Sequence, residues 1–292
     1  MSPADNSQLG RPQLNSEPQT LAPFAVEPVP PPQPQPAKPA LKANENPVWS
    51  GWDVLLIAGF TLLMLVITQL ALAPFMLRFA YPHANWLEIA QKPVSALLAQ
   101  LLTYIVVALY MILLLEGKYH THFWPAIRWN WPGIAGLSLL GLGVLMLGLD
   151  LLGRFLPMPK TTPFDVFFAR PIDAYLTVVF AVTLGPLMEE LFFRGFLYPV
   201  LARRLGVILG IVLTALPFGL MHYLQYRSWA AVLIIVLVGV VLTTVRAVTK
   251  SVASSFLAHV GYNGALMALT ALATDGFRHM DKAGFLIGMG AR

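Results

Sequence analysis

The sequence predicts an all-α protein, a polytopic membrane helix bundle of about seven to eight transmembrane helices, and three observations lead to this fold class. First, 57% of the 292 residues are hydrophobic and only 11% are charged, with a mean hydropathy of +0.67. Second, the hydrophobic residues gather in windows, most of them near the ~20 residues that cross a ~30 Å hydrocarbon layer. Third, these windows lack the alternating pattern of membrane strands, and a helix satisfies its own backbone donors and acceptors in lipid.

Seven apolar windows follow one another along the chain as candidate transmembrane helices. They cover residues 54–73, 94–115, 134–152, 174–202, 207–222, 229–245 and 252–273. Tryptophan, whose amphipathic ring prefers the headgroup level, occurs only at the ends of these windows or between them. The seven tryptophans are Trp49, Trp52, Trp86, Trp124, Trp129, Trp131 and Trp229. Their positions support the boundaries of the windows.

The chain divides into three parts by composition. Residues 1–50 hold 12 of the 24 prolines and few apolar residues, which predicts a disordered, proline-rich N-terminal tail. Residues 51–275 form the transmembrane bundle, and the polar motifs described below lie in its 174–273 part. Residues 276–292 are expected to be a short C-terminal tail.

The charge distribution indicates a membrane partner and no nucleic-acid partner. The formal net charge is +5, but the 19 Lys and Arg residues are spread thinly among the ends of the windows, where the lipid bilayer presents anionic headgroups. We therefore expect an integral, multi-pass membrane protein, located in the cell membrane if the source is bacterial. Asp150 and Arg154, at i,i+4 near the end of the third window, are expected to form a local pair. The absence of cysteine excludes disulfides, a catalytic thiol and Cys-ligated metals.

The fourth window carries charged residues near its middle: Glu189, Glu190 and Arg194. Each ionised group near the bilayer centre costs about 2.5–3.5 kcal/mol, which indicates either a structural ion pair or a functional site. Glu190 and Arg194 are at i,i+4 and are expected to face each other, whereas Glu189 is turned about 100° away. Glu189 is thus free of a local cation, as a general base would be. Gly185-Pro186, one turn upstream, lacks one backbone donor and is expected to kink the helix.

Two further windows also carry polar residues that lipid penalises. In the fifth window Phe218 and His222 share one helix face, and in the seventh His259 and Asn263 do the same. Taken singly, His222 fits an interfacial residue, and His259 with Asn263 fits a hydrogen bond between helices. Taken together with Glu189, they predict that three helices converge on one polar cavity.

These residues carry a resemblance to a known family. The segments Glu189-Glu190-Leu191-Phe192-Phe193-Arg194, Phe218-Gly219-Leu220-Met221-His222 and His259-Val260-Gly261-Tyr262-Asn263 resemble the EExxxR, FxxxH and HxxxN motifs, in that order. They are typical of the CPBP family of intramembrane proteases, also called the CAAX protease and bacteriocin-processing family. The resemblance covers about residues 174–273 and implies a hydrolase, an intramembrane endopeptidase of the glutamic type similar to CAAX prenyl proteases.

The resemblance also implies roles for single residues. Glu189 and His222 would activate a water molecule, and His259 and Asn263 would stabilise the oxyanion. Glu190, Arg194 and Phe218 would support the site. The implied substrate is a membrane-associated protein or peptide, with a prenylated CAAX-type C-terminus as one candidate and a plain membrane-proximal peptide as another.

Other classes of protein remain as alternatives at this stage. We expect no cofactor and no metal, but Glu189, His222 and His259 offer three ligands, so a zinc-dependent membrane peptidase is an alternative, although the sequence lacks HExxH. A non-catalytic membrane scaffold or bacteriocin-immunity-type binding protein would use the same cavity to hold a peptide. A transporter would need paired broken helices in two related halves, and only one is apparent.

Overall fold

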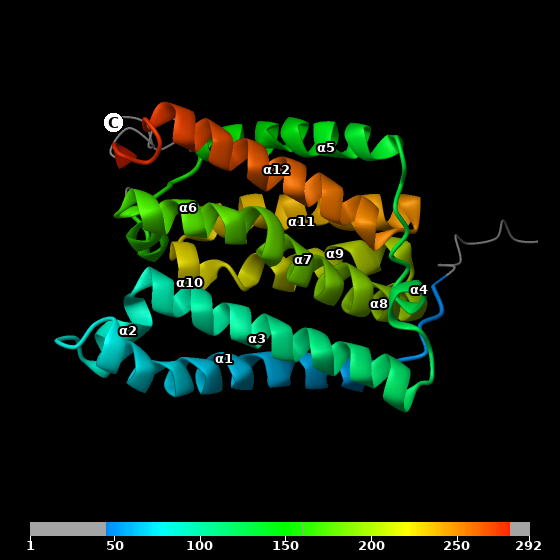
Figure 1. Cartoon of the computed structure of the whole chain (residues 1–292). Helices are drawn as coiled ribbons and strands as arrows, with labels where there is room; N and C mark the ends of the chain where they lie inside the picture. The colour runs from blue at the N-terminus through cyan, green and yellow to red at the C-terminus, as the bar shows by residue number, and fades with distance from the viewer. Residues whose placement is uncertain (1–44, 160, 281–292) are drawn as a thin grey trace, which may run out of the picture. The chain divides into compact units, whose positions relative to one another are not determined.

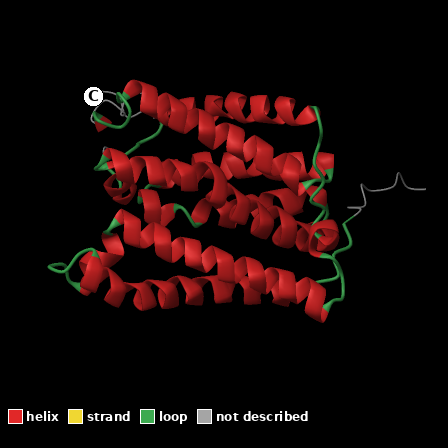
Figure 2. Ribbon diagram, viewed as in Figure 1, coloured by secondary structure: helices red, strands yellow, loops and turns green. Residues whose placement is uncertain are grey.

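The structure is a computed structural model that describes residues 45–159 and 161–280. Most of the predicted N-terminal tail, residues 1–44, and the end of the predicted C-terminal tail, residues 281–292, lie outside the described residues. Throughout the described part of the chain every regular element is helical and none is a strand (Figure 2). The predicted all-α class is confirmed.

Seven helical segments are long and apolar enough to cross a membrane, which confirms a multi-pass integral membrane protein. They span Gly51–Phe79, Pro93–Lys118, Ala135–Phe155, Pro171–Leu205, Val207–Tyr226, Trp229–Thr249 and Val252–Ala273. The predicted windows lie within these spans to within one residue, and most spans run further at one or both ends. The extensions arise because a helix continues past its apolar stretch until a cap or a proline stops it.

Several spans are built from more than one kind of helix. The helical elements are α1 (Gly51–Phe79), α2 (Trp86–Gln91), α3 (Pro93–Leu113), η1 (Leu114–Lys118), α4 (Phe123–Ala126), α5 (Ala135–Leu145), η2 (Met146–Phe155), η3 (Pro163–Phe168), α6 (Pro171–Val179), η4 (Phe180–Leu184), α7 (Gly185–Glu189), η5 (Glu190–Leu197), α8 (Tyr198–Leu205), α9 (Val207–Leu220), α10 (Tyr223–Tyr226), α11 (Trp229–Thr249) and α12 (Val252–Ala273). Of these, η1, η4 and η5 are π-helical, and η2 and η3 are 3₁₀-helical.

The spans pack in pairs around the fourth one. In Figure 1, α1 lies beside α3 on one side of the bundle, and α5 lies beside α12 on the opposite side. The fourth span lies between these two pairs, and α9 and α11 are next to it. Glycine permits the closest of these pairings. A Cβ at Gly143 of α5 would collide with the Ala258 carbonyl, and a Cβ at Gly261 of α12 would collide with that of Leu140. These glycines therefore let the backbones of α5 and α12 approach each other closely.

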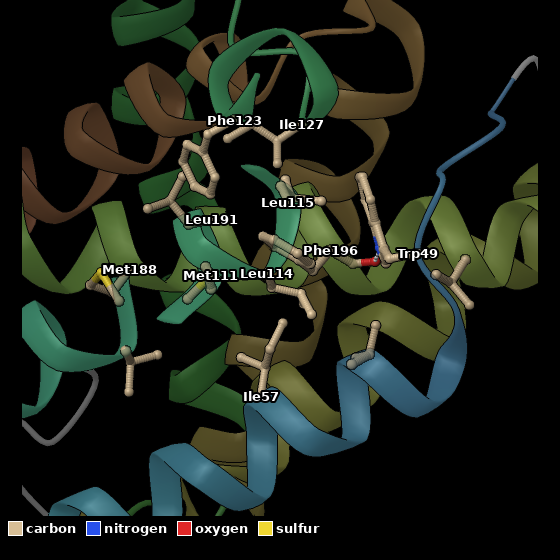
Figure 3. Packing of buried hydrophobic residues seen from close by; sticks show 13 residues of the cluster. Trp49, Ile57, Met111, Leu114, Leu115, Phe123, Ile127, Met188, Leu191 and Phe196 are labelled. Carbon is tan, nitrogen blue, oxygen red and sulfur yellow. Dashed lines mark hydrogen bonds between the residues drawn. The ribbon is translucent and has the colours of Figure 1, made fainter. Parts of the chain in front are cut away.

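The bundle begins before residue 51, because residues 45–50 are packed rather than tail-like. Trp49 is 1% exposed and its indole N–H donates to the Phe196 carbonyl at 2.9 Å (Figure 3). Glu45 is buried, and its carboxylate bridges Arg246 at 3.0 Å and Arg128 at 3.2 Å. The composition of residues 1–50 is dominated by prolines far upstream, so it does not distinguish this last stretch.

The predicted pair between Asp150 and Arg154 is wrong. Both residues lie in η2, a 3₁₀ helix, in which side chains three residues apart eclipse and side chains four apart point in different directions. The Asp150 carboxylate accepts a hydrogen bond from the Tyr262 hydroxyl of α12 at 3.0 Å instead. The third span is therefore joined to the seventh through a polar contact.

Candidate active site

The fourth span has two π-helical stretches, η4 before Glu189 and η5 after it, and proline explains the first. In a π-helix each N–H donates to the carbonyl five residues earlier, and the Gly185 N–H donates to Phe180 in this way. The next bond of the series would join residue 186 to the Ala181 carbonyl, but Pro186 has no N–H. The Asn263 side chain of α12 supplies the missing donor, with Nδ2 at 2.6 Å from the Ala181 oxygen. The predicted kink thus places α12 against the helix that carries Glu189.

Glu190 and Arg194 form the ion pair expected from their spacing, at 2.9 Å, and neither side chain is exposed. The Arg194 guanidinium also donates to the Gly239 carbonyl at 3.0 Å and to the Thr243 hydroxyl at 3.2 Å, both on α11. Its remaining face lies 4.3 Å from the centre of the Phe218 ring. The buried guanidinium is therefore fully surrounded and joins the fourth, fifth and sixth spans.

Glu190 has a second role, because its carboxylate also orients His259. The Ser255 hydroxyl donates to one oxygen at 2.6 Å, and His259 Nδ1 lies 2.9 Å from the other. A carboxylate that already binds a guanidinium acts as an acceptor, so His259 Nδ1 carries a proton. Its Nε2 then faces Glu189, with 3.7 Å between Nε2 and the Glu189 oxygen.

His222 is oriented in the same manner by the backbone. Its Nδ1 lies 2.9 Å from the Phe218 carbonyl, one turn earlier, and because a carbonyl oxygen only accepts, Nδ1 is the donor. The His222 Nε2 lies 4.0 Å from the other oxygen of Glu189. The Glu189 carboxylate therefore sits between two imidazole Nε2 atoms, and 16% of its side chain is exposed, so small molecules reach it.

All four residues predicted as catalytic line one cavity of about 480 Å³: Glu189, His222, His259 and Asn263. Glu190, Arg194 and Phe218, the predicted supporting residues, are buried behind its wall. Glu190 contacts His259, Phe218 contacts both His222 and His259, and Arg194 contacts Glu190 and Phe218. Much of the remaining lining is apolar or aromatic and comes from α3, η3, η4 and α12. The cavity thus combines a polar centre with a largely apolar wall, as ligand pockets commonly do.

Nothing in the described part of the chain groups three or more His, Cys, Asp or Glu side chains as ligands of a metal ion. Glu189, His222 and His259, the three ligands that the zinc alternative requires, have oxygen-to-nitrogen separations of 3.7 and 4.0 Å. The two imidazoles nevertheless present Nε2 to the same carboxylate while Nδ1 is held by another acceptor, which is also how proteins orient metal-ligating histidines.

Sequence reasoning missed several residues that complete the site: Thr243 and Ser255, which support Arg194 and Glu190, and Gln100 and Tyr104, which line the cavity from α3. Serine and threonine are common in membrane helices as partners between helices, so their residue types gave no signal. Gln100 and Tyr104 could have been found, because two polar side chains one turn apart inside an apolar window share one helix face.

Comparison with known proteins supports the family assigned from the motifs. Residues 171–265 match the family model described as "Type II CAAX prenyl endopeptidase Rce1-like". The match runs from the start of the fourth span into the seventh, about a third of the chain, and includes all three motifs. No curated protein matches the chain, and no solved structure does so either.

Proposed function

We propose that Glu189 and His222 activate the water that cleaves the substrate. The match of residues 171–265 to the type II CAAX prenyl endopeptidase model supports an intramembrane protease of the CAAX type. The observation that carries the proposal is the orientation of the two imidazoles. Both Nδ1 atoms are held by acceptors, which directs both Nε2 atoms at the Glu189 carboxylate.

A water molecule between Glu189 and His222 would donate one O–H to each. The separation of 4.0 Å between Glu189 Oε1 and His222 Nε2 leaves these two acceptors free of each other. Glu189 takes one proton as the water oxygen bonds to the scissile carbonyl carbon, and the C=O π electrons move to the carbonyl oxygen. The same proton then passes to the amide nitrogen as the C–N bond breaks, which leaves a carboxylic acid and a free amine.

His259 and Asn263 would stabilise the negative oxygen formed in that step. His259 Nε2 donates a hydrogen bond only when both ring nitrogens carry protons. Two carboxylates lie beside this ring, that of Glu189 at 3.7 Å from Nε2 and that of Glu190 at 2.9 Å from Nδ1.

The lining of the cavity favours a substrate with an apolar attachment. Leu97, Phe167, Phe180 and Met267 surround the polar centre with apolar and aromatic surface. A prenylated cysteine near a C-terminus presents a long hydrocarbon to such a surface, whereas a plain peptide presents only its side chains. We therefore favour the prenylated C-terminus over the unmodified membrane-proximal peptide.

A cleavage assay in proteoliposomes tests the proposal. Wild type, Glu189→Gln and the control Glu88→Gln, whose carboxylate lies in an exposed capping box of α2, are given matched quenched-fluorescence peptides with and without a prenyl group. Loss of a general base lowers rates by ~10²–10⁴, so Glu189→Gln should be slower by that factor at an unchanged thermal midpoint, and Glu88→Gln should match wild type. A wild-type protein that binds the peptides without cleaving them would instead be a binding protein.

A further inference from the structure

The oxyanion site assigned to His259 and Asn263 has few free donors. One N–H of the Asn263 amide is engaged by the Ala181 carbonyl at 2.6 Å, which leaves a single N–H for a substrate. His259 Nδ1 is engaged by Glu190 at 2.9 Å, so its Nε2 donates only as the imidazolium. A further neutral donor in the cavity would add to the stabilisation of the negative oxygen.

Tyr104 of α3 is such a donor. Its hydroxyl oxygen accepts a hydrogen bond from the Gln100 amide at 2.6 Å, one turn earlier on the same helix. A phenol that accepts a hydrogen bond through its oxygen still has its own proton to give. Both residues line the cavity together with Glu189. The Gln100 amide therefore fixes the hydroxyl oxygen while the proton remains available to the cavity.

Of the three other hydroxyls in the lining, two are already committed as donors, and the third belongs to Tyr226 of α10. The Tyr262 hydroxyl donates to Asp150 at 3.0 Å, and the Thr177 hydroxyl donates to the Asp173 carbonyl at 2.8 Å. The position of Tyr104 is also set on its other side, because its ring packs near that of Phe180, with 6.3 Å between the centroids. A donor that is fixed before the substrate arrives costs no reorganisation during the reaction.

We propose that Tyr104 is a further catalytic residue, whose hydroxyl donates to the carbonyl oxygen of the scissile bond, and that Gln100 is its positioning residue. The inference rests on the proteolytic function proposed above. It extends the site to α3, outside the 171–265 segment that matches the family. The second span, through α3, then contributes chemistry as well as packing.

The experiment compares kcat, KM and the thermal midpoint for the variants Tyr104→Phe, Gln100→Leu and the double variant, with Glu189→Gln in the same assay. The matched control is Tyr110→Phe on the same helix, whose ring packs on Phe60 and does not line the cavity. Removal of one oxyanion donor typically lowers kcat by ~10²–10³, so Tyr104→Phe should lose about 10²-fold in kcat with KM and the midpoint unchanged.

Gln100→Leu should give a smaller loss, because the hydroxyl is kept but no longer fixed, and the double variant should be no slower than Tyr104→Phe alone. Full activity of Tyr104→Phe, beside an inactive Glu189→Gln, overturns the inference and leaves the proposed function standing. The inference is equally overturned if Tyr104→Phe loses thermal stability in step with its activity. It is also overturned if the loss of kcat in the double variant is the product of the losses in Gln100→Leu and Tyr104→Phe. Absence of cleavage by the wild type overturns the proposed function and this inference with it.

Discussion

The bond between Asn263 and the Ala181 carbonyl gives a direct test of how the helix that carries Glu189 is held. Asn263→Ala removes the side chain that replaces the backbone donor missing at Pro186. A carbonyl left without a donor costs roughly 1–3 kcal/mol when it is buried. Ala181 lines the cavity and Asn263 is only partly buried, so water replaces some of the lost bond. We therefore expect about 1 kcal/mol of destabilisation, at the low end of that range.

A second substitution isolates this cost. Pro186→Ala restores an N–H at position 186, which reaches the Ala181 carbonyl in the π-helical register. In the Pro186→Ala background Asn263→Ala should then leave stability almost unchanged, which gives a coupling energy of about 1 kcal/mol between the two positions. Thr183→Ala serves as the control, because its hydroxyl bonds the Val179 carbonyl on the exposed side of the same kink.

The assay is thermal unfolding of the four proteins of this cycle in one detergent, where 1 kcal/mol corresponds to roughly 2–4 °C for a domain of this size. Cleavage rates of the same proteins separate the two roles of Asn263. A contact with the oxyanion predicts the same fall in kcat in both backgrounds, while the stability loss appears only beside Pro186. If Asn263→Ala destabilises both backgrounds equally, the amide does not replace the missing backbone donor and the reasoning fails.

The remaining predictions concern charge and metal. Glu190→Gln leaves Arg194 buried without its counter-ion, which typically costs ~3–5 kcal/mol, so the midpoint and the activity should both fall, and adding Arg194→Met should restore part of the midpoint. Glu45→Gln should lower the thermal midpoint with little change in kcat, because Arg246 loses its buried partner and neither residue lines the cavity. An unchanged midpoint would contradict the packing of residues 45–50 against the bundle. Exhaustive chelation should leave cleavage intact, whereas loss of activity that zinc restores would favour the metallopeptidase.

The positions of the spans could be predicted from the sequence because lipid permits few kinds of backbone structure. A long apolar run has to be a helix there, and its ends are marked by tryptophan and by charge. The same reasoning separated Glu189 from Glu190, since i,i+4 spacing assigned Arg194 to the second carboxylate, and the structure has that pair at 2.9 Å. These predictions depend only on local helix geometry, which is determined by residues close together in the sequence.

The predictions that failed or were not made concern contacts between residues on different helices. The pairing of Asp150 with Arg154 assumed an α-helix, but the local helix is 3₁₀, and Tyr262, more than a hundred residues away, takes the carboxylate. The contact from Glu190 to His259 also escaped prediction, because the motif spacing describes each helix separately. Glu190 binds Ser255 and His259 as well as Arg194, and so fixes the ring that faces Glu189.

Gln100 and Tyr104 show where the sequence rule itself was applied too narrowly. The rule that singled out His259 with Asn263 was that two polar side chains one turn apart inside an apolar window have to face protein or water. Gln100 and Tyr104 satisfy the same rule in the second window. Gln69 of α1 also lies within an apolar window, but its amide donates to Ser95 across the α1–α3 contact and does not line the cavity. Polarity in lipid thus predicts that a side chain turns inward, and only the packing of the spans decides whether it meets a neighbouring helix or the cavity.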